Sequence, residues 1–268
     1  MSAPRLQDRI CVVTGGGSGL GRAISLRFAD EGGHVVIGDV DAAGAEKTAI
    51  GVRERGRKAV VRHCDVTKLA DIDALIRSAA DELGRVDVVV ANAGVVEHDT
   101  DCLTMTEAQW DHTIDVNLKG VFFTLQAGAK RMAEQGGGGR LIAIASIMAE
   151  WGSGTSPAYT ASKGGVRQLV RSMGIAVGPL GITCNGIGPG FIETNMTQFL
   201  RDEPAMADYL IDRTPVGRIG RPEDIAAVAA FLAGDDASFM NGTVVYPDGG
   251  ITAGLYSQAV SIRATGEE

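Results

Sequence analysis

The stretch ICVVTGGGSGLG, residues 10–21, joins a short apolar run directly to a cluster of glycines. Ile10–Thr14 has the length and the near-continuous apolar content of a buried parallel strand. Gly15, Gly19 and Gly21 depart from the commoner GxGxxG spacing, but they allow the same close approach of a ligand because glycine carries no Cβ. A helix that begins directly after the loop would present unpaired N–H groups to an anion. The stretch therefore predicts a binding site for the pyrophosphate of a dinucleotide, with a plain tight turn as the alternative.

The rest of the chain repeats this alternation of strand and helix. Runs of strand length are Ile10–Thr14, His34–Asp39, Ala59–Cys64, Val86–Ala91, Leu141–Ala145, Ile182–Ile187 and Thr243–Tyr246. Helix-spaced apolar residues lie in Leu20–Glu31, Asp41–Arg55, Lys68–Leu83, Thr106–Glu134 and Pro157–Val177. Strict β-α alternation implies right-handed crossovers. It predicts an α/β fold with a doubly wound, parallel seven-stranded sheet flanked by helices.

Two segments need separate comment. Thr106–Glu134 is long for a single helix, and we expect two helices that meet before Asn117. Residues 190–221 interrupt the alternation after the sixth strand, at the place where the lid of a substrate site would lie. Because no internal repeat or linker is present, we expect one domain over residues 1–268.

The overall composition argues against several kinds of partner. The chain has 25 Lys and Arg against 33 Asp and Glu, a formal net charge of −8, and no basic run, which disfavours nucleic acid and anionic membranes. It has no apolar stretch of membrane-span length and no signal-peptide core, so we expect a cytoplasmic protein. The cysteines match neither a zinc site nor a CxxC pair, and no metal is expected; they are Cys11, Cys64, Cys102 and Cys184.

Asp39 closes the second predicted strand, where an acidic side chain accepts hydrogen bonds from the adenosine ribose hydroxyls. Its carboxylate would also repel a 2′-phosphate, so NAD is expected in preference to NADP. Arg22 would weaken this preference if it pointed toward the ribose. As an alternative, Asp39 caps the next helix, although Asp41 could fill that role independently.

Tyr159 and Lys163 lie four residues apart and therefore share one face of a predicted helix. A free phenol has a pKa of about 10, and a neighbouring ammonium lowers it. Tyr159 could then take a proton from an alcohol, or give one to a carbonyl, while a hydride moves to or from a nicotinamide. The spacing alone is most often accidental. It gains weight from the preceding strand, which ends at Ser146, and from the glycine loop.

Taken in order, these residues resemble the motifs of the short-chain dehydrogenase/reductase family in its compact single-domain type, which implies a Rossmann fold. The matching pieces are Thr14–Gly21, Asp65-Val66, Asn92-Ala93-Gly94, Asn117, Ser146, Tyr159-x-x-x-Lys163, Pro189-Gly190, Thr194, Gly217–Glu223 and Asp248–Gly250. Ala91 and Ala145 replace a common Asn and Ser and leave the chemistry in place. Residues 251–268 extend beyond the family's usual end, over either the pocket or a neighbouring subunit.

The resemblance implies a role for each matching residue. Ser146 would hold the substrate oxygen, Lys163 would bind the nicotinamide ribose, and Asn117 would position a water that relays protons to Lys163. With Tyr159 these residues form the expected catalytic set. The expected cofactor residues are Gly15, Ser18, Gly19, Leu20, Gly21, Asp39, Asp65, Val66, Asn92, Ala93, Gly94, Tyr159, Lys163, Pro189, Gly190, Ile192 and Thr194. For some of them, such as Asp65 and Asn92, capping of a strand end is an equally simple role.

The substrate pocket would be built from residues 95–99, 147–155 and 191–212. The candidate substrate residues are His98, Met148, Glu150, Trp151, Phe191, Met196 and Phe199. Their apolar walls with an occasional polar group favour a mid-sized secondary alcohol or ketone. Glu150 and His98 either read a second polar group or face solvent.

Three functions therefore compete. The favoured one, because of Asp39, is an NAD-dependent oxidoreductase that interconverts a secondary alcohol and a ketone. The second is a 3-oxoacyl-thioester reductase that uses NADPH. The third is a non-catalytic dinucleotide sensor, which predicts loss of catalytic residues, whereas Ser146, Tyr159 and Lys163 are present. The resemblance also implies a homotetramer that acts on a small molecule.

Overall fold

The computed structural model describes residues 4–97 and 100–254. His98 and most of the expected C-terminal extension, residues 255–268, lie outside this range. No helix in the described ranges combines the length and hydropathy of a membrane span.

A seven-stranded parallel sheet forms the centre of the described chain, with the strand order β3-β2-β1-β4-β5-β6-β7. The strands are β1 (Ile10–Thr14), β2 (His34–Asp39), β3 (Ala59–His63), β4 (Val88–Ala91), β5 (Gly139–Ile144), β6 (Ile182–Ile187) and β7 (Val244–Val245). The predicted α/β fold with a doubly wound sheet is confirmed. The strand order reverses between β1 and β4, and ligands of such sheets bind in the crevice outside the carboxyl ends of the strands at that point.

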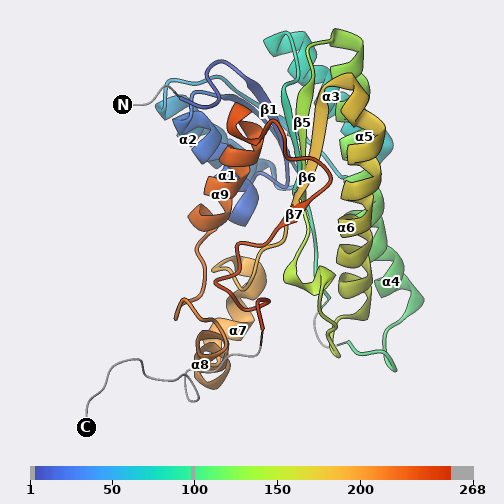
Figure 1. Cartoon of the computed structure of the whole chain (residues 1–268), viewed down its shortest axis with the longest axis vertical. Coiled ribbons are helices and arrows are strands. Elements are labelled where there is room, and N and C mark those ends of the chain that lie inside the picture. The colour runs from blue at the N-terminus through green and yellow to red at the C-terminus, as the bar shows by residue number, and fades with distance from the viewer. Residues whose placement is uncertain (1–3, 98–99, 255–268) are drawn as a thin grey trace.

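Helices cover both faces of the sheet (Figure 1). On one face lie α1 (Gly19–Asp30), α2 (Ala42–Glu54) and α9 (Pro222–Ala233), and on the other α3 (Leu69–Leu83), α5 (Val121–Gln135) and α6 (Pro157–Val177). Each face has its own apolar core: Phe28 and Ile225 belong to the first, and Leu75 and Leu125 to the second. Apolar strands covered on both sides explain why their sequences read as continuous apolar runs.

The long predicted helical segment contains an irregular turn. It consists of α4 (Glu107–Ile114), the π-helix η1 (Asp115–Gly120) and α5. At the start of α4, Thr106 and Gln109 form a reciprocal capping box. The first α-helix ends before Asn117, as predicted, but the chain continues through a π-helical turn instead of breaking. Asn117 lies within this turn and is fully buried.

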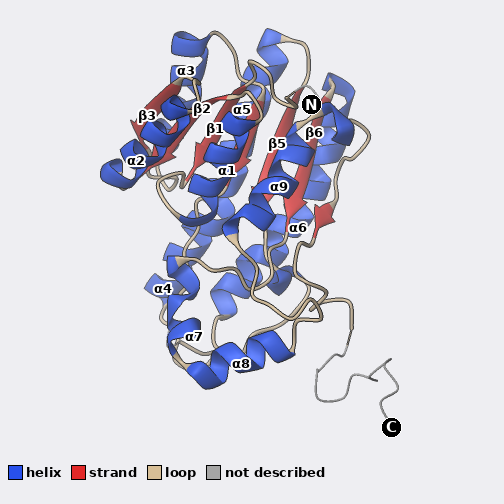
Figure 2. Cartoon of the chain, turned by 90° about the vertical axis from the view of Figure 1, so that its left-hand side faces the viewer, coloured by secondary structure: helices blue, strands red, loops and turns tan. Residues whose placement is uncertain are grey.

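The segment of residues 190–221 forms a small lobe beyond the carboxyl ends of the strands (Figure 2). It contains α7 (Gln198–Asp202) and α8 (Pro204–Asp212). Its two ends are joined, because Gly220 N donates to Phe191 O and Glu193 N donates to Gly220 O, each at 2.9 Å. The lobe therefore projects from a closed base next to the crevice.

Candidate active site

A cavity of about 600 Å³ opens in the crevice at the carboxyl end of the sheet. The predicted cofactor residues that line it are Gly15, Ser18, Gly19, Leu20, Asp39, Asp65, Val66, Asn92, Ala93, Gly94, Tyr159, Lys163, Pro189, Gly190, Ile192 and Thr194. Gly21 is absent from this lining. The structure thus gathers residues spread from 15 to 194 around one space.

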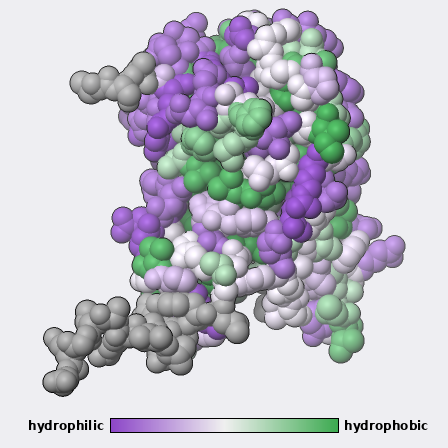
Figure 3. Space-filling view, in the orientation of Figure 1, coloured by the Kyte–Doolittle hydropathy of each residue, from purple (hydrophilic) through white to green (hydrophobic). Residues whose placement is uncertain are grey.

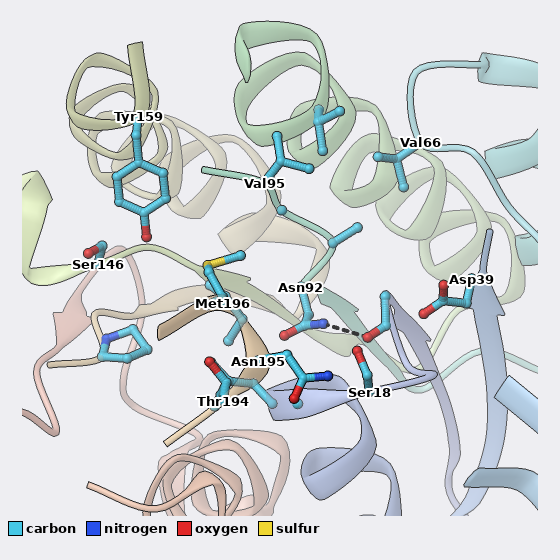
Figure 4. Close-up of a pocket in the computed structure, with 18 of the residues that line it drawn as sticks. Ser18, Asp39, Val66, Asn92, Val95, Ser146, Tyr159, Thr194, Asn195 and Met196 are labelled. Carbon is cyan, nitrogen blue, oxygen red and sulfur yellow. Dashed lines mark hydrogen bonds between the residues drawn. The ribbon is translucent and has the colours of Figure 1, made fainter. Parts of the chain in front are cut away.

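The glycine loop has no room for side chains where it turns under the cavity. A Cβ on Gly15, whose φ is +63°, would lie 2.9 Å from Ala93 Cα. A Cβ on Gly21 would lie 2.1 Å from the carbonyl oxygen of Gly15. Gly21 therefore does not face the cavity but lets α1 start directly against the loop. Ser18 is the N-cap of α1, yet its side chain makes no capping bond, and it lies beside the cavity (Figure 4).

Asn92 ties β4 to this loop. Its Nδ2 donates to Thr14 O at 2.8 Å and to Gly15 O at 3.0 Å, and its backbone N donates to Thr14 Oγ1 at 3.1 Å. The side chain thus caps the end of β1, as the simpler alternative proposed, and also lines the cavity. One residue fixes the glycine loop against the strand on the other side of the switch point.

Asp39 lies at the far end of the cavity from Tyr159 (Figure 4). Its Oδ2 accepts a hydrogen bond from Gly17 N, and its Oδ1 accepts one from Asp41 N, both at 2.8 Å. The cap of α2 is supplied by Asp41, whose side chain accepts from Ala43 N. Asp39 is therefore held by the glycine loop itself, and each carboxylate oxygen retains capacity for a further donor.

Asp65 and Val66 form the wall opposite the glycine loop. Hydrogen bonds from Thr67 hold the pKa of Asp65 below its usual value, and they keep the side chain in a local turn. Val66 is buried and packs against Gly120, where a Cβ would lie 2.9 Å from Val66 Cγ2. The two residues contribute shape to this wall, with Asp65 restrained by its own loop.

Tyr159 and Lys163 project from α6, and Ser146 is the N-cap of the 3-10 helix η2 (Ile147–Ala149) that follows β5. The Tyr159 hydroxyl points into the cavity near Ser146 (Figure 4). Lys163 is 3% exposed, and its Nζ donates to Ile144 O at 2.9 Å and lies 5.5 Å from the centroid of the Tyr159 ring. Ser146 Oγ accepts from Met148 N at 3.1 Å, which leaves its O–H free to donate.

Burial dominates the electrostatics of this pair. It raises the pKa of Tyr159, and a hydrogen bond with Ser146 offsets part of the rise. Burial also lowers the pKa of Lys163 to about 8. The sequence predicted that the Lys163 ammonium lowers the pKa of Tyr159, but burial has the larger effect on this pKa. Lys163 Nζ faces the Tyr159 ring and donates to a backbone carbonyl. Ser146 is the group that favours the phenolate.

Asn117 lies beside Lys163 with Gly94 between them. A Cβ on Gly94 would lie 3.3 Å from Asn117 Oδ1 and 3.7 Å from Lys163 Nζ. The Asn117 side chain binds both backbone groups of Val95, accepting from N at 2.8 Å and donating to O at 2.7 Å. Asn117 thus fixes the position of Val95, which lines the cavity.

The segment after β6 closes the other side of the cavity. A Cβ on Gly190 would lie 2.8 Å from Asp248 Cα, so only glycine fits this crossing with the segment after β7. Pro189 O accepts from Ile147 N at 3.1 Å. Thr194 Cγ2 would lie 3.6 Å from a Cβ on Gly19, which places the base of the lobe against the glycine loop.

Most of the predicted substrate residues that the structure describes do not line the cavity. Met196 lines the cavity, whereas Met148, Glu150, Trp151, Phe191 and Phe199 are not among its lining residues, and His98 lies outside the described residues. The Glu150 carboxylate instead contacts Tyr246 and Arg167.

Seven lining residues lie outside the residues and segments predicted for the site: Val40, Cys64, Thr67, His112, Val116, Ile144 and Ala145. Val95, Asn195 and Thr197 also line the cavity, and they lie in the segments predicted for the substrate pocket. His112 precedes Val116 by one helical turn, and this spacing could have identified both. Within the described residues, no cluster of His, Cys, Asp or Glu side chains is arranged to hold a metal ion.

Comparison with known proteins covers almost all of this structure. A family model described as enoyl-(acyl carrier protein) reductase matches residues 15–252. The (2S)-[(R)-hydroxy(phenyl)methyl]succinyl-CoA dehydrogenase subunit BbsD of Thauera aromatica is 38% identical over 91% of this chain and 97% of its own. The L-rhamnose 1-dehydrogenase (NAD(P)(+)) of Azotobacter vinelandii is 37% identical over 93% and 99%.

A solved structure agrees with these sequence matches. The gluconate 5-dehydrogenase of Burkholderia cenocepacia, in complex with NADP and tartrate, superposes with a TM-score of 0.89 at 34% identity, over 94% of this chain and 98% of that one. These three relatives are named as dehydrogenases. With its glycine loop, its parallel sheet and its Ser146, Tyr159 and Lys163 in one cavity, the chain belongs to the short-chain dehydrogenase/reductase family.

Proposed function

We propose that this protein is an NAD-dependent oxidoreductase that interconverts a secondary alcohol and a ketone, with Tyr159 as its acid and base. The observation that carries the proposal is the meeting of the Tyr159 and Ser146 hydroxyls at one end of a cavity whose other end is lined by Asp39 and the glycine loop (Figure 4). Hydroxyls that converge in one cavity can hold and protonate one oxygen atom.

The cavity fits a dinucleotide. The glycine loop leaves no Cβ in the way, and the first N–H groups of α1 have no partner within the helix. Asp39 would hold the adenosine ribose and Lys163 the nicotinamide ribose, and Thr194 would contact the carboxamide. When bound, the nicotinamide ring supplies the acceptor or the donor of the hydride.

The residues of the chain would perform the proton chemistry. In oxidation, the Tyr159 phenolate accepts the proton of the substrate hydroxyl; in reduction, the neutral phenol returns a proton to the carbonyl oxygen. The Ser146 O–H donates to the same oxygen and stabilises its developing charge. Lys163 places a buried cation, or a neutral amine above its pKa of about 8, behind the Tyr159 ring. Asn117 would hold the water that connects Lys163 to solvent.

Asp39 supports NAD as the cofactor. A carboxylate at this place accepts hydrogen bonds from both ribose hydroxyls and repels a 2′-phosphate. Arg22, the cation that could weaken this preference, is exposed and is not among the residues that line the cavity. The NADP complex of the Burkholderia cenocepacia relative makes cofactor preference the first quantity to measure.

The experiment is a screen in which NAD reduction is followed by the absorbance of NADH. The panel contains cyclohexanol, L-rhamnose, gluconate, tartrate and (3R)-3-hydroxybutyryl-CoA, each with NAD and with NADP. We expect turnover with at least one alcohol, and a higher kcat/KM with NAD. Turnover of the thioester alone, with NADP preferred, would contradict the alcohol dehydrogenase.

One observation favours the second candidate, a 3-oxoacyl-thioester reductase. The Thauera aromatica relative is named for a CoA thioester, and the matching family model is described by acyl carrier protein. The catalytic residues serve both reactions, so the substrate alone distinguishes them. Among the predicted substrate residues that the structure describes, Met196 alone lines the cavity, and it offers a flexible apolar wall to either kind of molecule.

We also propose that the protein forms a homotetramer in the cytoplasm and acts as one domain. Apolar surface gathers over α9 and the segment that leads into β7 (Figure 3), where Phe231 and Phe239 are exposed. Exposed aromatic side chains at the edge of a sheet are typical of an interface. Light scattering coupled to gel filtration tests the assembly, and a monomeric mass would contradict it.

A further inference from the structure

A cluster of polar side chains lies behind the Ser146 turn, outside the cavity. Glu150 is the C-cap of η2, and its Oε1 accepts a hydrogen bond from the Tyr246 hydroxyl at 2.7 Å. The same oxygen lies 2.8 Å from Arg167 Nε. The Glu150 and Arg167 side chains are 32% and 33% exposed, so the ion pair lies at the surface with about a third of each side chain in contact with solvent. One carboxylate therefore joins three elements: the turn after β5, α6 and the segment after β7.

Two of these elements carry the hydroxyl and amine groups of the proposed chemistry. Arg167 lies one helical turn beyond Lys163 on α6, and Glu150 ends the short helix whose N-cap is Ser146. The ion pair thus connects the far end of the Ser146 turn to the helix that carries Tyr159. Ion pairs that are partly desolvated and geometrically restrained hold elements in one relative position.

The third element reaches the cofactor side of the cavity. The Tyr246 ring packs on Gly188, the residue that follows β6, because a Cβ there would lie 2.3 Å from its Cδ1. Gly188 leads directly into Pro189, whose carbonyl accepts from Ile147 N at 3.1 Å. The start of η2 is therefore held by the segment on which Tyr246 rests, and its end is held by Glu150.

The charges around the carboxylate are consistent with this arrangement. Burial raises the pKa of Tyr246, and the Glu150 carboxylate raises it further, so the hydroxyl stays protonated and donates. Arg167 and Arg171, both on α6, oppose this rise. The cations that face the cluster thus come from one helix, and they attract Glu150 toward α6.

We propose that Glu150 is a positioning residue, which holds the Ser146 turn on α6 through Arg167. Tyr246 fixes the direction of the same carboxylate. The consequence is a fixed placement of the Ser146 hydroxyl against the Tyr159 hydroxyl. The inference rests on the proposed function, in which these two hydroxyls hold the substrate oxygen. Glu150 is not among the residues that line the cavity, so it acts through Ser146 and not on the substrate.

The Ser146–Tyr159 hydrogen bond provides a readout that a merely structural role would not move. This bond offsets part of the rise that burial causes in the pKa of Tyr159. If the turn shifts, the bond is lost and the pKa of Tyr159 increases. Lys163, whose Nζ lies 5.5 Å from the ring centroid, is on the same helix as Tyr159, so its effect stays constant.

The test is a pH titration of Tyr159 by carbon-13 NMR of tyrosines labelled at Cζ, in the free protein and with NAD added. The chain has four tyrosines, and Tyr159→Phe assigns the resonance.

In Glu150→Ala we expect the pKa of Tyr159 to rise by about half to one pH unit. Turnover of the best alcohol in the screen should fall by about tenfold with little change in KM. Glu150→Gln, which keeps an acceptor for Tyr246 but not the charge that faces Arg167, should fall between.

Glu82→Ala is the matched control, because Glu82 pairs with Arg62 at 42% side-chain exposure on each side, and neither residue lines the cavity. It should change neither the pKa nor the turnover. A Glu150→Ala or Glu150→Gln protein with an unchanged pKa of Tyr159 overturns the proposal, and so does a changed KM without a pKa shift. Full turnover in Tyr159→Phe would instead overturn the proposed function, while the titration in the Glu150 variants would still test the placement of Ser146.

Discussion

The two ends of the cavity are built in different ways. At the Asp39 end, the groups that line it are fixed by the backbone: Gly17 N and Asp41 N hold the carboxylate, and Asn92 holds the glycine loop. At the other end, the lobe presents Met196, which lines the cavity and is 38% exposed. The Asp39 end is therefore held by hydrogen bonds to the backbone around β1 and β2. The lobe is joined to the sheet where its two ends are hydrogen-bonded to each other, at Phe191, Glu193 and Gly220.

Because of this difference, substitutions at the two ends of the cavity should affect different properties of the protein. At the Asp39 end, removal or addition of an atom disturbs buried backbone contacts, so binding and stability change together. At the lobe, a side chain can be replaced with little effect on the sheet, so specificity can change alone. One scaffold can therefore retain a cofactor site while its substrate site varies.

The largest effect is expected at Tyr159, at the end of the cavity opposite Asp39. In Tyr159→Phe the ring remains but the proton donor and acceptor is lost, so kcat should fall by about 10³-fold. Titration of the protein with NADH, followed by fluorescence, should give a Kd within about twofold of wild type, a range we take as no change in binding free energy. A large loss of NADH binding would show that the hydroxyl supports the cofactor end instead.

Asp39 should give the next largest effect, confined to the cofactor end. In Asp39→Ser the carboxylate that disfavours a 2′-phosphate is removed, and we expect the ratio of kcat/KM for NAD to that for NADP to fall by about 10²-fold. The measurement is initial rates with both cofactors on one alcohol. Asp41→Ser is the control, because Asp41 caps α2 and does not line the cavity. An unchanged ratio in Asp39→Ser would remove the argument for NAD.

A substitution at Gly21 tests whether close backbone contacts in the glycine loop exclude a side chain. Its Cβ in Gly21→Ala would lie 2.1 Å from Gly15 O and 2.5 Å from Asn92 Nδ2. Overpacking of this kind costs about 1–3 kcal/mol, which lowers Tm by roughly 2–5 °C in a chain of this size. Gly164→Ala in α6 is the matched control: a Cβ there meets nothing within 4 Å, and the variant should be as stable as wild type or more. Equal Tm values for the two variants would contradict the steric account.

Much of the Asp39 end was predictable because it is local in sequence. The strand β1, the glycine loop and the start of α1 are consecutive, and each has a pattern that residue types reveal. The α9 helix was not predicted, because it follows the irregular lobe, in which the sequence does not alternate between strand and helix patterns. The π-helical turn at Asn117 was predicted as a break, since an i→i+5 pattern has no residue signature of its own.

The site's long-range contacts were the least predictable. Glu150 was expected to read the substrate or to face solvent; it is exposed and does not line the cavity, and its carboxylate also binds Arg167 and Tyr246, which is 96 residues away in the chain. The sequence also could not show that burial has the largest influence on the pKa of Tyr159, because the burial of a side chain depends on the fold. Spacing along a helix predicts neighbours on one element, but contacts between elements depend on how the sheet places them.

The smallest effect is expected at the lobe, in Met196→Ala. Met196 lines the cavity and is exposed, so its loss should raise the KM for an apolar alcohol by about threefold to tenfold, as one or two methylene contacts would. Tm and the Kd for NADH should remain those of wild type, in contrast to the Gly21 variant. The control is Met206→Ala, since Met206 is similarly exposed on α8 and does not line the cavity. If Met196→Ala weakened NADH binding as strongly as it raised KM, the two ends of the cavity would not be independent, because the lobe would then be part of the cofactor site.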